Sequence, residues 1–246
     1  MFPDAKKDII SKLQKDILQQ EGYRSQPADI KRIPGLENIE AAFPGRFFPT
    51  GAIHEFLSFE PEHGAASGGF IAGLLGSLMQ RGGACLWIST ARKVFPVALH
   101  TFGVSPDRII FVNVQYDKEA LWVMEEALKC KGLAGIVAEV RELTFMQSRR
   151  LQLAVETSHV TGFILRTDAR RLTTTACVAR WQIKPVPSQL EAGMPGVGFP
   201  RWEVALLRVR NGKPGKWTME WQSGQFQLIT EKLITVVIPE QIRRVG

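Results

Sequence analysis

The sequence contains no long apolar run. No stretch reaches the ~18 consecutive apolar residues that a helix needs to cross a bilayer, although 45% of the 246 residues are hydrophobic, enough for a sizeable buried core. The first eight residues, MFPDAKKD, are rich in charge and lack the apolar stretch of a signal peptide. We therefore expect a cytoplasmic protein with no membrane segment.

Cysteine and histidine are also scarce. The chain has three cysteines and four histidines, namely Cys85, Cys130, Cys177, His54, His63, His100 and His159. They are scattered, and no C-x-x-C pair is present, so neither a disulfide framework nor a zinc site has its ligands. We expect buried or half-buried thiols and no bound metal. No motif arranges a catalytic triad, and for His63 a surface loop position is the favoured interpretation.

Positive charge is unevenly distributed. The chain carries 31 Lys and Arg against 24 Asp and Glu, a formal charge of +7. Residues 161–246 hold 13 basic and 6 acidic residues, so their excess of 13 − 6 = 7 accounts for the whole net charge, and residues 1–160 are balanced at 18 against 18. This asymmetry is typical either of a solvated basic surface or of a face that meets nucleic acid or an acidic protein.

The N-terminal segment predicts an amphipathic helix over residues 6–20. Its apolar side chains recur at helical spacing, and they are Ile9, Ile10, Leu13, Ile17 and Leu18. Gly22 is placed to end the helix, and residues 23–49 contain four prolines in a polar context, which predicts a linker. The apolar face is a candidate partner-binding surface, with docking on its own domain as the alternative.

From residue 50 the pattern predicts an α/β core that extends to residue 222. Short apolar strands at 52–58, 84–89, 109–114, 134–140 and 162–166 alternate with helices at 69–80, 92–102, 118–129 and 144–158. This alternation predicts right-handed crossovers and a mostly parallel central sheet covered on both faces. Strands at 176–183, 201–210 and 217–221 follow without helices and predict an antiparallel extension, interrupted by a long loop at 184–200. Residues 223–246 are expected to form a further strand and a basic tail.

The connection after the first strand resembles a degenerate nucleotide loop. Gly64 and Gly69 have the G-x-x-x-x-G spacing of a phosphate-binding loop, with Ser67 and Gly68 between them. The next two residues should be Lys and Ser or Thr, which hold phosphate and magnesium, but they are Phe70 and Ile71. Neither side chain supplies a charge or a metal ligand. We expect a tight turn rebuilt for packing, with no ATP binding and no other cofactor.

Glu139 is the remaining candidate of a nucleotide site. It is the only acid in the apolar strand at 134–140 and stands near its carboxyl end, where a carboxylate can bind magnesium through water. Without the lysine and hydroxyl of the loop, we expect it instead to form a hydrogen bond or salt bridge, with Arg141 or Arg149 as candidate partners.

Several sequence blocks resemble one family. They are ACLWIS at 84–89, RKVF at 92–95, FGVSPDRIIFV at 102–112, ALWVMEEAL at 120–128, GIVAEV at 135–140, SRRLQLA at 148–154, TGFILR at 161–166, RW at 180–181 and PGVG at 195–198. Their order resembles that of the error-prone repair protein ImuA family, over about residues 36–222. The resemblance implies a RecA-like fold and a non-catalytic accessory role in damage-induced (SOS) translesion synthesis.

The same resemblance implies partners. Members of the family work with the Y-family-like protein ImuB and an error-prone C-family polymerase, and RecA is a further candidate partner at the nucleoid. Two alternatives stay open: a RecA-like nucleotide-dependent ATPase, and a SulA-like inhibitor of cell division.

Six arginines are candidate contacts to DNA or to an acidic partner. They follow two strands of the predicted sheet, and they are Arg141, Arg149, Arg150, Arg166, Arg170 and Arg171. Arginine at such places grips phosphate through two hydrogen bonds, although we expect at least one of the mid-helix pair to form an ordinary salt bridge. Four tryptophans in the basic third could stack on bases, but strand aromatics are more often core residues. They are Trp181, Trp202, Trp217 and Trp221.

Overall fold

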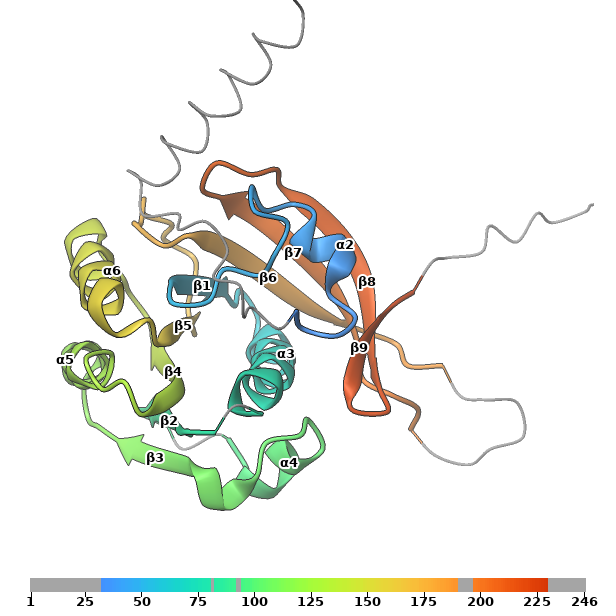
Figure 1. Cartoon of the computed structure of the whole chain (residues 1–246), viewed down its shortest axis with the longest axis horizontal. Coiled ribbons are helices and arrows are strands. Elements are labelled where there is room, and N and C mark those ends of the chain that lie inside the picture. Colours follow the sequence, from blue (N-terminus) through green and yellow to red (C-terminus); the bar gives the residue numbers. More distant parts are fainter. Residues whose placement is uncertain (1–31, 81, 92–93, 190–196, 230–246) are drawn as a thin grey trace, which may run out of the picture.

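The described part of the chain is built around one nine-stranded sheet (Figure 1). The computed structural model describes residues 32–80, 82–91, 94–189 and 197–229. The strands lie in the order β3-β2-β4-β5-β1-β6-β7-β8-β9. Their bounds are β1 (Ile53–Leu57), β2 (Ala84–Ser89), β3 (Ile109–Asn113), β4 (Leu133–Val140), β5 (Thr161–Arg166), β6 (Ala179–Val186), β7 (Arg201–Val209), β8 (Gly215–Gln222) and β9 (Gln225–Leu228). Strands β3 to β6 in this order pair in parallel, and β6 to β9 pair antiparallel.

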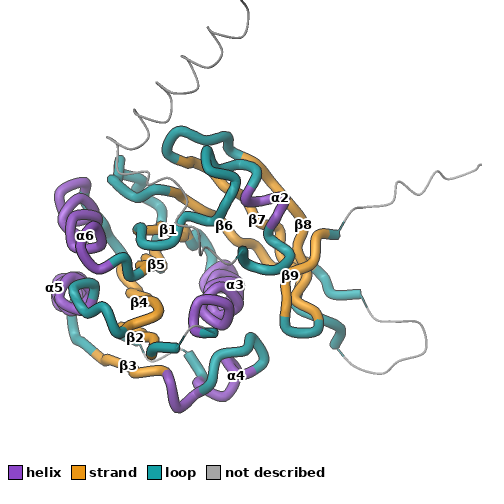
Figure 2. Tube along the Cα trace, viewed as in Figure 1, coloured by secondary structure: helices purple, strands orange, loops and turns teal. Residues whose placement is uncertain are grey.

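Helices cover both faces of the parallel part, as Figure 2 shows. Helix α3 (Pro61–Met79) packs on one face, and α5 (Asp117–Ala127) and α6 (Phe145–Ser158) pack on the other. Short helices complete the described chain, namely α2 (Glu37–Glu40), α4 (Pro96–His100) and the 3-10 turn η1 (Pro106–Arg108). Every residue of β1 and β5 is buried, because a parallel strand between two helical layers has no solvent-facing side. The predicted α/β architecture with its antiparallel extension is confirmed.

The segment before β1 differs from the linker that we predicted. Within its described part, Leu36 and Ile39 are fully buried, and Phe43 and Phe48 are 2% exposed. These side chains belong to the apolar cluster that α3 forms with β6 to β9. Residues 32–49 are therefore part of the domain, and their prolines shape a packed connection. The predicted N-terminal helix lies outside the described residues, as do residues 230–246 of the predicted C-terminal segment.

Several predicted boundaries also shift. Helix α3 begins at Pro61, eight residues earlier than expected, and the helix expected at 92–102 is reduced to α4. Strand β6 begins three residues later than predicted and extends to Val186, which shortens the long loop after it. No helix in the described parts of the chain is long and apolar enough to cross a membrane.

An aromatic cluster fills the core beside β1. The His54 ring stacks on Phe48 at a centroid distance of 4.5 Å, donates from Nε2 to the Pro49 carbonyl at 2.7 Å, and accepts at Nδ1 from Trp181 Nε1 at 3.3 Å. Trp181, Trp202 and Trp221 are buried in the same core, so the base-stacking interpretation is wrong for these three. Trp217 is partly buried and packs against that core. Cys85 and Cys177 are buried as expected.

One thiol differs from the expectation. Cys130, at the end of the turn after α5, is exposed. The buried thiols have pKa values raised to about 12 by burial, so they are protonated and unreactive at neutral pH.

Candidate functional site

The glycine segment after β1 is helical and does not form a loop. Gly64, Ser67, Gly68 and Gly69 all lie within α3, which starts with Pro61 at its first turn. A Cβ atom at Gly69 would lie 3.1 Å from the Phe102 ring and 3.4 Å from that of Trp202. The glycine therefore lets α3 approach these rings. The predicted tight turn is wrong, although the prediction that this segment serves packing is consistent with these contacts.

Phe70 and Ile71 are fully buried. The Phe70 ring lies 4.9 Å from that of Phe226 and packs edge-on against Trp202 at 5.8 Å. A phosphate-binding lysine needs to reach solvent-accessible phosphate, whereas position 70 faces the interior of the domain. The structure thus places the lysine position of the expected motif in the middle of an aromatic core.

Glu139 is engaged on both carboxylate oxygens. Oε1 accepts from Trp87 Nε1 at 2.8 Å, and Oε2 accepts from Ser89 Oγ at 2.9 Å. The predicted partners Arg141 and Arg149 are wrong. Within the described residues, no group of three His, Cys, Asp or Glu side chains could hold a metal ion.

Three polar atoms near the start of α3 lack hydrogen-bond partners in the part of the chain that the structure describes. They are Ser58 Oγ, Ser67 Oγ and His63 Nδ1. A Cβ at Gly64 would stand 3.9 Å from Ser58 Oγ, so the first turn of α3 covers the end of β1. His63 is half-buried in this helix and is not the surface loop histidine that we predicted.

A basic cleft lies at the carboxyl ends of β4 and β5. It has a volume of about 910 Å³ and opens between the N-terminal ends of α5 and α6. Four of the six predicted arginines line it, together with Lys118; they are Arg141, Arg166, Arg170 and Arg171. Arg149 and Arg150 do not line it. The structure thus brings together the residues that follow two neighbouring parallel strands, as the topology requires.

Most of these arginines are already paired with carboxylates. Arg170 binds both oxygens of Asp168 at 2.9 and 2.6 Å, and its hydrogen bonds lower the pKa of Asp168 to about 2. Arg141 lies 3.8 Å from Asp117, whose carboxylate also accepts from the Arg141 amide at 2.7 Å.

Of the two arginines in the middle of α6, Arg149 and Arg150, one is paired with a carboxylate of the described chain and one is not, as we expected. Arg150 binds Glu125 at 2.6 Å, which confirms that one of the two forms an ordinary salt bridge. Arg171 and Arg149 are exposed, and neither has a carboxylate partner within the described chain. Because most of the arginines that line the cleft are paired with carboxylates, the cleft carries only a weak positive charge.

Arg166 is buried and cannot contact a partner. Its side chain is 1% exposed and pairs with the fully buried Glu55 at 3.1 Å. Arg166 also donates to the main-chain carbonyls of Arg141 at 2.9 Å and Arg171 at 3.1 Å, so it anchors both walls of the cleft. The other oxygen of Glu55 binds Arg180 at 2.8 Å. Sequence reasoning missed Glu55, although a charge inside the apolar strand HEFL is a signal that it needs a partner.

Exposed apolar side chains line the cleft or lie next to its lining residues in sequence. Tyr116 lines the cleft at 56% exposure and stacks under the Lys118 ammonium at 5.6 Å. Phe145, Met146 and Leu172 adjoin the cleft in sequence and are 49%, 68% and 52% exposed. A hydrogen bond from Thr173 Oγ1 to the Leu143 carbonyl at 2.7 Å holds the two segments that carry them together. Large exposed apolar side chains around a polar cleft are typical of a protein interaction surface.

The strand order, the parallel core and the helix that follows β1 define a RecA-like α/β protein. Among solved structures, the RadB recombinase has a similar fold, with a TM-score of 0.51, 15% sequence identity, and coverage of 75% of this chain and 93% of that chain. No protein-family model matches the sequence. The proteins named Protein ImuA from two strains of Caulobacter vibrioides are each 34% identical over 200 residues, covering 76% of this chain and 82% of theirs. The chain therefore belongs to the ImuA family.

Proposed function

We propose that this chain is a non-catalytic accessory protein of damage-induced translesion DNA synthesis. In this role it acts as an adaptor for an ImuB-like Y-family protein and an error-prone C-family polymerase, with RecA as a further partner. Membership of the ImuA family supports the role in damage-induced mutagenesis. The observation that carries the non-catalytic part is the burial of Phe70 within α3, where an active relative would need a lysine.

Helix α3 also removes the geometry that phosphate needs. A phosphate-binding loop presents free backbone amides to the ligand, but amides beyond the first turn of a helix donate to carbonyls four residues back. Residues 64–69 begin at the fourth position of α3, so most of their amides are committed. We infer that ATP and magnesium do not bind here, which disfavours the ATPase alternative.

The cleft is the surface that we assign to a protein partner. Asp117, Glu142 and Asp168 alternate with its basic residues, and DNA-binding grooves need unpaired cations along the phosphate backbone. Its rim offers exposed aromatic and aliphatic side chains. This combination favours an acidic peptide segment with apolar side chains over nucleic acid.

Co-purification with an ImuB-like partner tests the adaptor role. The cleft variant Arg171→Glu with Leu172→Asp should reduce partner recovery at least about tenfold, because it reverses an unpaired charge and removes rim apolar area. Lys213→Glu is the matched control, since this exposed lysine lies in the turn between β7 and β8. Unchanged recovery with the cleft variant would contradict the assignment of the surface.

A second set of variants tests the N-terminal segment, which lies outside the described residues. Charged replacements at Ile10, Leu13 and Ile17 should also abolish co-purification if the predicted helix face binds the partner. Retained binding would contradict the assignment of the helix face and would leave the assignment of the cleft unaffected.

Three further measurements separate the alternatives. Calorimetry with ATP and magnesium should show neither binding heat nor turnover, whereas either would favour the ATPase. Binding to the tubulin-like division protein would favour the SulA-like inhibitor. Direct DNA contact would appear as an affinity that falls steeply with salt.

A further inference from the structure

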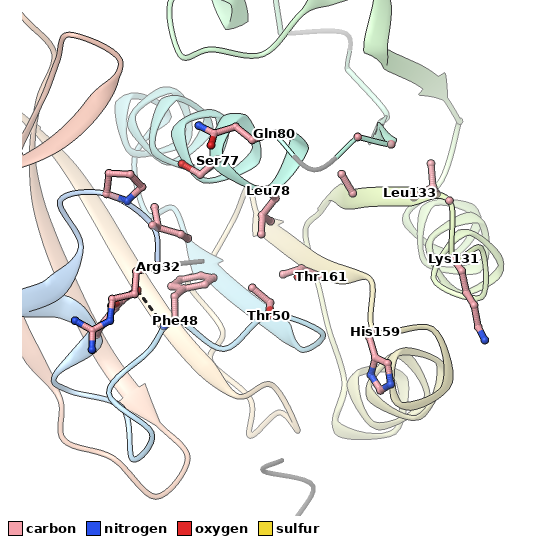
Figure 3. Close-up of a pocket in the computed structure, with 17 residues that line it drawn as sticks. Arg32, Phe48, Thr50, Ser77, Leu78, Gln80, Lys131, Leu133, His159 and Thr161 are labelled. Atoms are coloured by element: carbon pink, nitrogen blue, oxygen red, sulfur yellow. Dashed lines mark hydrogen bonds and ion pairs between the residues drawn. The ribbon is translucent and has the colours of Figure 1, made fainter. Parts of the chain in front are cut away.

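A second pocket lies at the opposite edge of the sheet from the cleft. It has a volume of about 410 Å³ and is enclosed by residues 32–50, the C-terminal end of α3, and the connections that lead into β2, β4 and β5 (Figure 3). In Figure 3, Phe48, Thr50, Leu78 and Thr161 lie at its centre, with Ser77 and Gln80 on the α3 side. None of these residues belongs to the cleft, so the pocket is a separate site.

Glu40 is a buried carboxylate in the wall of this pocket. The residue is 1% exposed. Its Oε1 accepts from the Phe48 amide at 3.4 Å, but Oε2 has no hydrogen-bond partner among the described residues. Burial raises the pKa of Glu40, while the Phe48 and Ile33 amides and the charge of Arg32 lower it. A carboxylate oxygen removed from water without a partner is costly, so a donor that reached it would gain a strong hydrogen bond.

Within the described chain, the cation that lies beside Glu40 is Arg32, and its geometry is poor. Arg32 Nε lies 3.9 Å from Oε2, beyond hydrogen-bond distance, and the Arg32 side chain is 60% exposed. Solvent competes for such an arginine, and exposed ion pairs contribute little. Arg32 is therefore a weak counter-ion that another cation could replace.

The rest of the pocket also suits a cation on an apolar stem. The last turn of α3 contributes Ser77 and Leu78, and its C-cap residue is Gln80; this end of a helix carries the negative pole of its dipole. Phe48, Leu78 and Leu133 provide apolar wall. The Lys131 side chain, the other lysine or arginine of the wall besides Arg32, points away from the central residues in Figure 3.

We propose that this pocket binds an alkylguanidinium or alkylammonium group, as carried by an arginine or lysine side chain or by a small diamine-like molecule. The cation binds Glu40 Oε2 and displaces Arg32, and its methylene stem packs on Phe48 and Leu78. The pocket is thus a cation-recognition site on the face of the molecule away from the basic cleft.

Nuclear magnetic resonance titration of the full chain tests this proposal. Agmatine is the small-molecule probe, and butylurea is a neutral probe of similar shape. Agmatine should shift the amide signals of Thr50, Gly83 and Leu133, and butylurea should bind at least about tenfold more weakly because it lacks the charge. A capped Ala-Arg-Ala tripeptide against capped Ala-Leu-Ala distinguishes a peptide source from a free small molecule.

Two variants change the affinity in opposite directions. Glu40→Gln should weaken agmatine binding about tenfold or more, and Arg32→Ala should strengthen it a few-fold by removing the competing cation. Thermal denaturation checks that both variants fold. If Glu40→Gln does not fold, the affinity of Arg32→Ala for agmatine alone tests the proposal. Absent shifts with both cationic probes, equal binding of butylurea, or an unchanged affinity for agmatine in Arg32→Ala would overturn the proposal.

Discussion

Replacing Phe70 by lysine would restore the residue type of a phosphate-binding loop and should nevertheless unfold the domain. Phe70 is fully buried and its ring contacts those of Phe56, Trp181, Trp202 and Phe226. Loss of a buried phenyl ring costs about 3–5 kcal/mol. The lysine must also bury an ammonium group or lose its proton, and each unit of pKa depression adds about 1.4 kcal/mol.

The combined cost of Phe70→Lys is a large part of the unfolding free energy of an ordinary domain. A loss of at least about 4 kcal/mol stands against a total unfolding free energy of about 5–15 kcal/mol. We expect Phe70→Lys to be largely unfolded or to show a strongly lowered urea midpoint, measured by tryptophan fluorescence. Phe70→Leu keeps most of the apolar volume and should cost about 1–2 kcal/mol.

A matched control separates burial from the added charge. Ala65 is exposed on the same helix, so Ala65→Lys should leave the unfolding free energy within about 0.5 kcal/mol of the native value. The reasoning is refuted if Phe70→Lys is as stable as Ala65→Lys. Measurable ATP turnover by Phe70→Lys would refute it as well, because the lysine would then face a nucleotide.

Four further perturbations follow from the same structure. Burial lowers the pKa of His54 from 6.5 to about 4. Neutral His54 therefore makes its full contribution to the unfolding free energy above pH 6.5, and this free energy falls by up to about 3 kcal/mol as the pH decreases to 4. Chemical denaturation across this range should show a pH dependence of the unfolding free energy that is weaker in His54→Gln. Glu55→Leu leaves the buried Arg166 without its counter-ion and should cost about 3–5 kcal/mol in urea unfolding, so a loss below 1 kcal/mol would contradict the role of the pair. Gly73→Ala would place a Cβ 2.7 Å from the Phe226 ring and should destabilise by about 1–3 kcal/mol. Gly64→Ala meets no atom closer than 3.9 Å and should stabilise by about 0.5–1 kcal/mol, because alanine favours the helix; a destabilised Gly64→Ala would argue for a functional loop.

The sheet could be predicted from sequence because its signal is local. Parallel strands buried on both faces are nearly continuous apolar runs, and the helices between them have clear apolar periodicity. Start and end positions were less accurate. The first turns of α3 were not predicted because they contain Gly64, Gly68 and Gly69. Glycine disfavours helices unless tertiary packing offsets its cost. Pro61 was the available signal, because proline is favoured at the first helical position.

The long-range polar contacts could not be predicted. Glu55 and Arg166 are 111 residues apart and meet only because β1 and β5 are neighbours in the sheet. The cleft followed from the rule that the carboxyl ends of parallel strands share an edge, but sequence could not show which arginines would be neutralised. The prediction of a linker in the proline-containing segment before β1 was wrong for a related reason. The apolar side chains of this segment find their partners in the cluster of α3 and β6 to β9, and no local pattern reveals that packing.

The buried guanidinium of Arg166 gives the two walls of the cleft a common support. Both the Arg141 and Arg171 carbonyls bind to one rigid planar group, which is itself fixed by Glu55. One wall cannot move away without breaking a hydrogen bond in the interior, where no water replaces it. The spacing between the walls is therefore set before any partner arrives, and a flexible segment would have to adapt to it.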